Sequence, residues 1–347
     1  MKQVTKGAET RFGSRPVVRA ILLLVLWAMP GLASAQVIQS ITSATPDFGT
    51  IVSAPSGTSI YRSAASSGAI TPVSGNATRL TTGNSRAMVT LACNQNACRN
   101  TAVAVRVGST GSPTGRVDPL TNFTIAVGTA SFQVAPSGTN PVSFTLRPIG
   151  TNGGTVTFFI GADLPVEGNE SPVSPGNATS AFYVYIAPSG TTPTLATTSG
   201  PSSGAAIARV LRPITIANST SLAFGRVMRP TTGSGSVAIS ASTGSRTISG
   251  TGALGLASPA PTRAAYSVSG EGGQAFSISV PATFLMTGPG TPLSVSLTST
   301  ASGSQTLSGA LGAAGSLSFF VGGSFPLNST TARGQYSGSF AVTVQYN

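Results

Sequence analysis

Apolar residues recur at every second position in short runs along much of the chain, while helical spacing of three and four is nearly absent. Clear runs lie at 103–107, 123–127, 142–146, 276–280, 293–297 and 340–346. Period-two alternation is typical of strands that bury one face. Turn-rich clusters at 108–115 and 299–305 separate some of these runs. The pattern predicts an all-β fold of short strands.

The pattern also occurs twice. GTVTFFIGADLPV at 154–166 matches GSLSFFVGGSFPL at 315–327 without a gap, which aligns Phe158 with Phe319 and Gly161 with Gly322. Further segment pairs follow in the same order: 41–52 with 216–227, 89–105 with 266–280, and 176–186 with 334–344. We therefore expect two tandem immunoglobulin-like or pilin-like β-sandwich domains, each large enough to bury a core, with hairpins at 89–105 and 266–280.

The first 35 residues have the features of a secretory signal. Five basic residues precede an apolar run at 20–29, and Ala33 and Ala35 form an A-x-A cleavage site. The run is shorter than the roughly twenty residues that a bilayer span needs. A Ser/Thr/Pro/Gly-rich stretch then separates the two copies and is expected to be a linker. The predicted organisation is a signal peptide at 1–35, domains at 36–186 and 207–347, and a linker at 187–206.

Charge adds little to this picture. The chain has 19 Lys+Arg and 7 Asp+Glu, and the leader holds five of the basic residues and one acidic residue, which leaves 14 and 6, a net charge of +8. The remaining basic residues are all Arg and are scattered. Nucleic-acid-binding proteins cluster such residues on one face, so this class is disfavoured. The surface could instead attract anionic polysaccharide.

The chain contains no His, which excludes Ser-His-Asp triads and His-ligated metals. Of the carboxylates, only Asp163, Glu167 and Glu170 lie close in sequence. Calcium could bind there, but the spacing fits no EF-hand, and a solvated acidic loop is the preferred interpretation. Glu271 is expected to be solvated in a hairpin turn. We predict no catalytic residue, no cofactor and no metal site, and hence not an enzyme.

Cys93 and Cys98 are the only cysteines. In an exported chain they are expected to form a disulfide across the two arms of one hairpin, in the place of the Gly-rich turn of the second copy. Structural zinc needs four ligands, and redox pairs have a different spacing.

Several motifs of the second copy occur in the order known from one family: LAFG, YSVSGEGGQAFSISVP, FFVGGSFPL and GQYSGSFAVTVQYN. Residues 213–347 closely resemble the secreted proteobacterial domain-of-unknown-function 4402 family (DUF4402). The first copy resembles a diverged relative, since it has Cys in its turn and lacks the Tyr-Asn ending. The resemblance implies no activity.

The end of the chain is similar to pilin subunits of chaperone–usher fibres. Those have a Gly fourteen residues from the C-terminus, alternating apolar residues and a penultimate Tyr. The matching residues here are Gly334, Phe340, Val342, Val344 and Tyr346. Such a strand could pair with another chain by strand addition. Any last strand of a sandwich alternates in this way, however, and the start at 36–44 is short for a pilin donor strand.

Three functions remain open from the sequence. The first is a structural or adhesive surface protein, non-catalytic, located in the periplasm or at the cell surface, with other surface or fimbrial subunits as partners. The second is a carbohydrate- or ligand-binding module that uses Tyr61, Tyr183, Tyr185 or Tyr266. The third is a pilin-like subunit.

Overall fold

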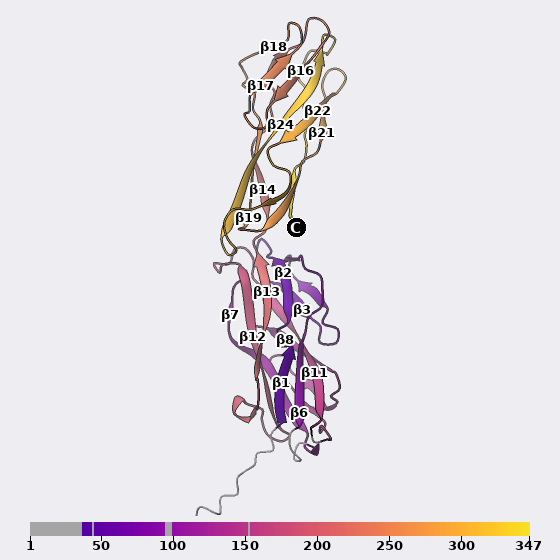
Figure 1. The fold of residues 1–347 in the computed structure, drawn as a ribbon, viewed down its shortest axis with the longest axis vertical. Helices are drawn as coiled ribbons and strands as arrows, with labels where there is room; N and C mark the ends of the chain where they lie inside the picture. Colours follow the sequence, from indigo (N-terminus) through magenta and orange to yellow (C-terminus); the bar gives the residue numbers. More distant parts are fainter. Residues whose placement is uncertain (1–36, 44, 94–98, 152) are drawn as a thin grey trace, which may run out of the picture.

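The computed structural model describes residues 37–43, 45–93, 99–151 and 153–347. The predicted signal peptide at 1–35 lies outside these residues. The described chain is almost entirely β, as the alternation predicts, with one short 3₁₀ helix, η2, at Leu195–Thr197. None of its helices is long and apolar enough to cross a membrane. The strands form two units, which lie end to end along the longest axis of the molecule (Figure 1).

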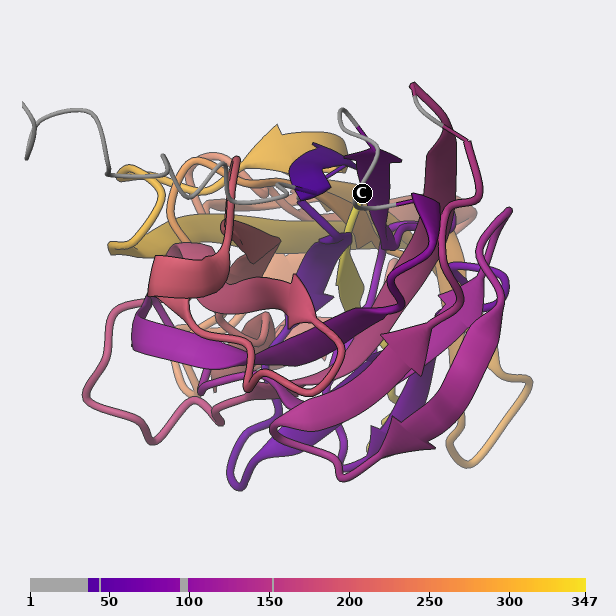
Figure 2. The same ribbon diagram turned by 90° about the horizontal axis from the view of Figure 1, so that it is seen from below.

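The first unit consists of two sheets packed face to face, with strands wrapped around a common interior when viewed along the long axis (Figure 2). Sheet 1 has the order β1-β6-β11-β3-β4, with β8 also paired to β11: β1 Val37–Ser43, β6 Ala87–Cys93, β11 Thr155–Val166, β3 Ser59–Ser63, β4 Ile70–Ser74 and β8 Thr121–Val127. Sheet 2 has the order β5-β2-β13-β12-β7-β10-β9: β5 Thr78–Arg79, β2 Asp47–Val52, β13 Ser203–Leu211, β12 Gly176–Pro188, β7 Val103–Thr114, β10 Val142–Leu146 and β9 Phe132–Ser137.

The second unit follows a similar plan. Sheet 3 has the order β14-β19-β24-β16-β17, and β22 joins β24 to β21: β14 Thr215–Thr220, β19 Ala264–Glu271, β24 Ala314–Asn328, β16 Ser234–Ile239, β17 Arg246–Ser249, β22 Leu293–Ser299 and β21 Thr283–Met286. Sheet 4 is the pair β15 Val227–Met228 and β18 Leu254–Gly255. Sheet 5 has the order β23-β20-β25: β23 Gly303–Thr306, β20 Ala275–Ser279 and β25 Thr343–Tyr346.

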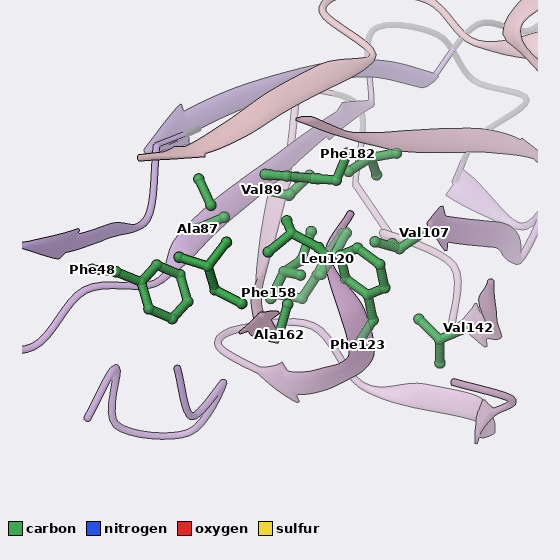
Figure 3. Packing of buried hydrophobic residues seen from close by; sticks show 14 of the residues in the cluster. Phe48, Ala87, Val89, Val107, Leu120, Phe123, Val142, Phe158, Ala162 and Phe182 are labelled. Carbon is green, nitrogen blue, oxygen red and sulfur yellow. The ribbon is translucent and has the colours of Figure 1, made fainter. Parts of the chain in front are cut away.

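The repeated sequence forms the same strand in both units. β11 pairs with β6 in its first half and β3 in its second, and β24 pairs in the same way with β19 and β16. The orders of sheets 1 and 3 therefore correspond strand for strand along their main path. In the first unit, Phe158 on β11 lies in the same core cluster as Leu120, Phe123 and Phe182 from other segments (Figure 3). Inward side chains at every second position supply the apolar core of each sandwich-like unit.

Two sequence-based expectations differ from the structure. The segments 89–105 and 266–280 are not hairpins, because β6 and β19 lie in sheets 1 and 3 whereas β7 and β20 lie in sheets 2 and 5. Each segment crosses from one layer to the other. Alternation cannot distinguish the two arrangements, since both bury the same side chains against a shared core.

The second difference concerns the linker expected at 187–206. Its last residues begin β13, Ser203–Leu211, which pairs antiparallel with β12 and parallel with β2 in sheet 2. Ala206, Ala208 and Val210 point into the core of the first unit. The last strand of sheet 2 thus ends at Leu211, because apolar residues at alternate positions suit a strand with one buried face despite the Ser- and Gly-rich start.

Candidate interaction site at the C-terminal segment

Two glycines explain part of the repeated sequence. A Cβ on Gly161 would lie 2.2 Å from the carbonyl oxygen of Ser63, and a Cβ on Gly322 would lie 2.2 Å from that of Ile239. Both contacts are far shorter than van der Waals distance and involve backbone, which cannot easily move. Each glycine sits where its long strand passes from one neighbour to the next. A side chain there would separate the strands.

A second repeated feature is an arginine over the second phenylalanine of each copy. The Arg86 guanidinium lies 3.5 Å from the Phe159 ring centroid, and that of Arg263 lies 3.4 Å from the Phe320 centroid. Arg86 donates to the carbonyl of Ala65, and Arg263 donates in the same way to Ala241. Sequence analysis missed this pair, although the two arginines occupy aligned positions. The arrangement is a structural cation–π contact rather than a charged binding patch.

The acidic residues expected in one loop are divided between a strand and a loop. Asp163 is buried in β11, where it accepts hydrogen bonds from Arg62 Nε at 2.6 Å, Arg62 Nη2 at 2.7 Å and Asn122 Nδ2 at 2.9 Å. Glu170 follows in the loop and accepts from the Gly57 amide at 2.6 Å. Within the part of the chain that the structure describes, no three acidic or cysteine side chains are placed to hold a metal ion. Asp163 therefore binds neighbouring side chains, and Glu170 binds the backbone of another loop.

Glu271 is not solvated, contrary to the expectation from its Gly-rich surroundings. The residue ends β19 and is completely buried where the second unit meets the first. Its carboxylate accepts a hydrogen bond from Arg212 Nη1 at 2.9 Å and another from the Gly312 amide. The ion pair with Arg212, which directly follows β13, offsets the cost of burying the carboxylate. Glycines beside Glu271 let the backbone of 310–313 approach it, which sequence alone does not reveal.

Tyr346 completes this junction. Its hydroxyl donates to the Arg212 carbonyl at 2.9 Å and accepts from the Glu271 amide at 2.7 Å. Burial raises the pKa of the hydroxyl above its ordinary value. The penultimate tyrosine thus joins the last strand, the end of β19 and the segment that leaves the first unit.

The rest of the C-terminal segment is less enclosed. Phe340, Val342 and Val344 are only half-buried, although the Phe340 ring lies 5.1 Å from that of Phe284. Gly334 has a φ of +146°, and a Cβ there would meet Pro289 at 2.4 Å. Regular pairing begins only at β25, where the register sets Val344 opposite Ile278 on β20. An apolar segment with this exposure has surface left to contact another molecule.

The predicted disulfide remains a prediction, because Cys98 lies outside the described residues. Cys93 ends β6 and is fully buried.

The tyrosines proposed for carbohydrate binding differ in accessibility. Tyr61 is buried and donates to the Ala77 carbonyl, and the ring of Tyr266 stacks on Phe319. Tyr183 and Tyr185 are half-buried on the outer face of β12, with ring centroids 4.3 Å apart. A shallow depression lies nearby, lined by residues that include Arg106, which is opposite Tyr185 in the β-ladder. Of the four tyrosines considered for carbohydrate binding, Tyr183 and Tyr185 are therefore the pair that lies on an outer face.

Comparison with known protein families gives a match, which lies in the second unit. The family model described as "Domain of unknown function (DUF4402)" matches residues 214–346. No curated protein matches the chain. One solved structure, described as "Chaperone-tip adhesin complex is vital for synergistic activation of CFA/I fimbriae biogenesis", is similar at 10% sequence identity and a TM-score of 0.25, covering 88% of this chain and 96% of that chain.

Proposed function

We propose a function from the chemistry of the chain itself, because the family model that matches residues 214–346 is described only as a domain of unknown function. The protein is an exported, non-catalytic structural or adhesive protein of the periplasm or cell surface. It contacts other polypeptides, fimbrial or other surface subunits, through the edge of its C-terminal segment. The two units are two domains that meet near Arg212, and the first is a diverged copy of the second. The matching orders of sheets 1 and 3 support the duplication.

The half-buried apolar row Phe340, Val342 and Val344 carries this proposal. An alternating segment of this kind presents both apolar side chains and backbone groups, which are the features used in β-strand addition. The carboxylates support the non-catalytic part. Asp163 and Glu271 are both buried and paired with arginine, and this pairing favours a structural role over proton transfer.

Site-specific photocrosslinking in the source cells tests the proposal. A photoreactive amino acid would replace Ala341, which is exposed between Phe340 and Val342, and a matched control would replace Ser294, which is exposed on β22. We expect crosslinks to a second polypeptide in the periplasmic or surface fraction from position 341 alone. Retention of the protein in the cytoplasm, or equal crosslinking from both positions, would contradict the proposal.

A carbohydrate-binding function is the second candidate, favoured by the stacked and accessible pair Tyr183 and Tyr185. Aromatic faces beside an open depression are suited to sugar rings, although both rings here already contact each other. A glycan array probed with the mature protein and a Tyr183→Ala/Tyr185→Ala double variant tests it. Binding that the double variant loses supports this candidate, and the absence of any glycan hit contradicts it.

A further inference from the structure

The first unit contains a strand that comes from outside its repeated region. β13 lies between β12 and β2 in sheet 2, antiparallel to β12 and parallel to β2. It contributes Ala206, Ala208 and Val210 to the core. Beneath it, the inward residues of β12 and β2 are fully buried: Phe182, Val184, Ile186 and Ile51. β12 thus has a hydrogen-bonded partner on each of its two edges.

The second unit contains the strands that flank this position. Residues 334–346 correspond to β12, because the bridge between Thr287 and Ser337 repeats the pairing of Thr114 with Thr179. Further along, Val344 lies opposite Ile278 as Ile186 lies opposite Val105. Gly334 and Gly176 occupy the start of the two segments, both with positive φ.

Residues 223–228 correspond in turn to β2. Gly225 has a φ of +70° and Gly49 a φ of +74°. Val227 pairs with Gly255 on β18, as Ile51 pairs with Arg79 on β5. The hydrogen bond from the Leu256 amide to the Arg226 carbonyl, 3.0 Å, repeats the one from Leu80 to Thr50, 2.9 Å. Both borders of the β13 position are therefore present in the second unit.

Within the described chain, no strand of the second unit lies between these borders. We call the strip between residues 334–344 and 223–228 the open lane. Its borders are more exposed than their counterparts: Phe340, Val342 and Val344 are half-buried, Val227 is half-buried, and the exposed fraction of Met228 is 51%.

The backbone of the lane shows the same difference. In the first unit, the Val184 amide donates to the Ser202 carbonyl at 2.8 Å, at the start of β13. Within the described residues, the corresponding Val342 amide makes no hydrogen bond. Residues 338–342 are accordingly not part of a ladder, and β25 has four residues where β12 has thirteen. An apolar row and a free backbone amide along one edge are features that an added strand can use.

We propose that the open lane binds an extended segment of another polypeptide, antiparallel to residues 334–342 and parallel to β15. The inference rests on the proposed function and specifies its partner. The segment has small apolar side chains at alternate positions, as β13 has Ala206, Ala208 and Val210. Its outward side chains are neutral or acidic, because the second unit has six arginines and one acidic residue, Glu271, which is already paired with Arg212.

A synthetic peptide of residues 202–212, Ser-Ser-Gly-Ala-Ala-Ile-Ala-Arg-Val-Leu-Arg, is the probe because it has the sequence that fills the equivalent position. Hydrogen–deuterium exchange would be measured on the chain from Gln36 to Asn347 with and without excess peptide. We expect exchange at least tenfold slower at 338–342 and 226–228, with the Val342 amide among those protected. A peptide with Ala206→Asp and Ala208→Asp is the matched control and should protect neither segment.

A second peptide with Arg209→Glu tests the charge argument and should bind more tightly than the first at low salt. A Val342→Thr chain, nearly isosteric and less apolar, should lose most of the protection while β24 exchanges as before. Three results would overturn the open-lane proposal. They are exchange that neither binding peptide changes, equal protection by the Asp control peptide, and protection confined to residues 176–186. Crosslinking from position 341 would then still support the surface-protein proposal, so the two failures are distinguishable.

Discussion

Gly161 and Gly322 are glycines at matching positions of the two copies, and each lies in close contact with the backbone of a neighbouring strand. Both side-chain-free positions face carbonyl oxygens of a neighbouring strand end, Ser63 and Ile239. Neither glycine has a positive φ, so space rather than backbone conformation excludes other residues. The phenylalanine two positions before each glycine, Phe159 or Phe320, carries an arginine above its ring. The twin segments are thus constrained residue by residue.

We predict that Gly322→Ala destabilises the second unit by about 1–3 kcal/mol, since an added methyl in a packed position forces the backbone apart. Gly161→Ala should do the same to the first unit. Ser318→Ala, on an exposed position of β24, is the control and should change stability by less than about 0.5 kcal/mol. Urea unfolding of the three variants measures the effect, and a Gly322→Ala protein as stable as the control would contradict it.

Tyr346 makes the stability of the second unit sensitive to alkaline pH. Its pKa is raised by burial, so the unfolded chain loses this proton at a lower pH than the folded chain. The stability contribution is complete below the ordinary tyrosine value, about pH 10, and is lost as the pH rises through the raised pKa. A Tyr346→Phe protein should lose less stability between neutral and alkaline pH than the unchanged protein.

Tyr266 serves as a comparison for this prediction. Burial raises the pKa of its hydroxyl as well, and this hydroxyl is still present in the Tyr346→Phe protein. The Tyr266→Phe variant should therefore show the same direction of change, and the double variant a further reduction. Thermal unfolding followed at several pH values measures all three. Identical alkaline losses in the unchanged and Tyr346→Phe proteins would reject the assignment.

At the scale of single elements, β25 is short, but its contacts are expected to stabilise the second unit. It pairs with β20, and its Tyr346 reaches the junction near Arg212. Complete burial of a large apolar side chain is worth about 1.5–3 kcal/mol. Three half-buried residues and Tyr346 together approach the net stability of a small domain, about 5–15 kcal/mol.

Deleting residues 338–347 should therefore unfold the second unit and leave the first folded, because sheets 1 and 2 contain none of these residues. Calorimetry of the chain with and without the segment is the measurement, alongside size-exclusion chromatography. Two transitions should become one. If both transitions persist and only assembly is lost, the segment serves mainly as a contact for other chains.

At the scale of the whole molecule, hydrogen bonds and apolar contacts join the two units. Ser53 of the first unit bonds the Leu211 carbonyl, and Arg212 next to it bonds Glu271 of the second. The Leu211 side chain packs in the core of the second unit. These contacts favour a fixed orientation along the long axis in Figure 1.

The Glu271→Gln change should loosen this junction. Removing one partner of a buried ion pair costs about 3–5 kcal/mol, and we expect about 3 kcal/mol because the Arg212 side chain is partly exposed. Small-angle scattering should show a broader range of inter-unit distances, and the two unfolding transitions should move apart. Glu170→Gln, in an exposed loop of the first unit, is the control. Unchanged scattering for Glu271→Gln would show that apolar packing alone fixes the orientation.

The sequence by itself determined the class of fold and much of the inner face of its strands. Alternation identifies Val103, Val105 and Val107 as one buried row, because a strand's side-chain period is independent of its neighbours. The match between 154–166 and 315–327 likewise located one core strand in each unit, since the two segments share the same pattern of apolar, glycine and proline positions.

Only the tertiary structure decided which strands pair and which polar groups are buried. The crossing between layers at 89–105, the entry of β13 into sheet 2 and the burial of Glu271 all depend on contacts between residues far apart in the chain. Local composition assigned Ser203–Leu211 partly to a linker and Glu271 to solvent, because neither residue type nor period reveals what packs against a segment. The open lane of the second unit is a further example. Residues 334–344 align with residues 176–186 of the fully paired β12, but the sequence pattern does not show whether a neighbouring strand is present to pair with them.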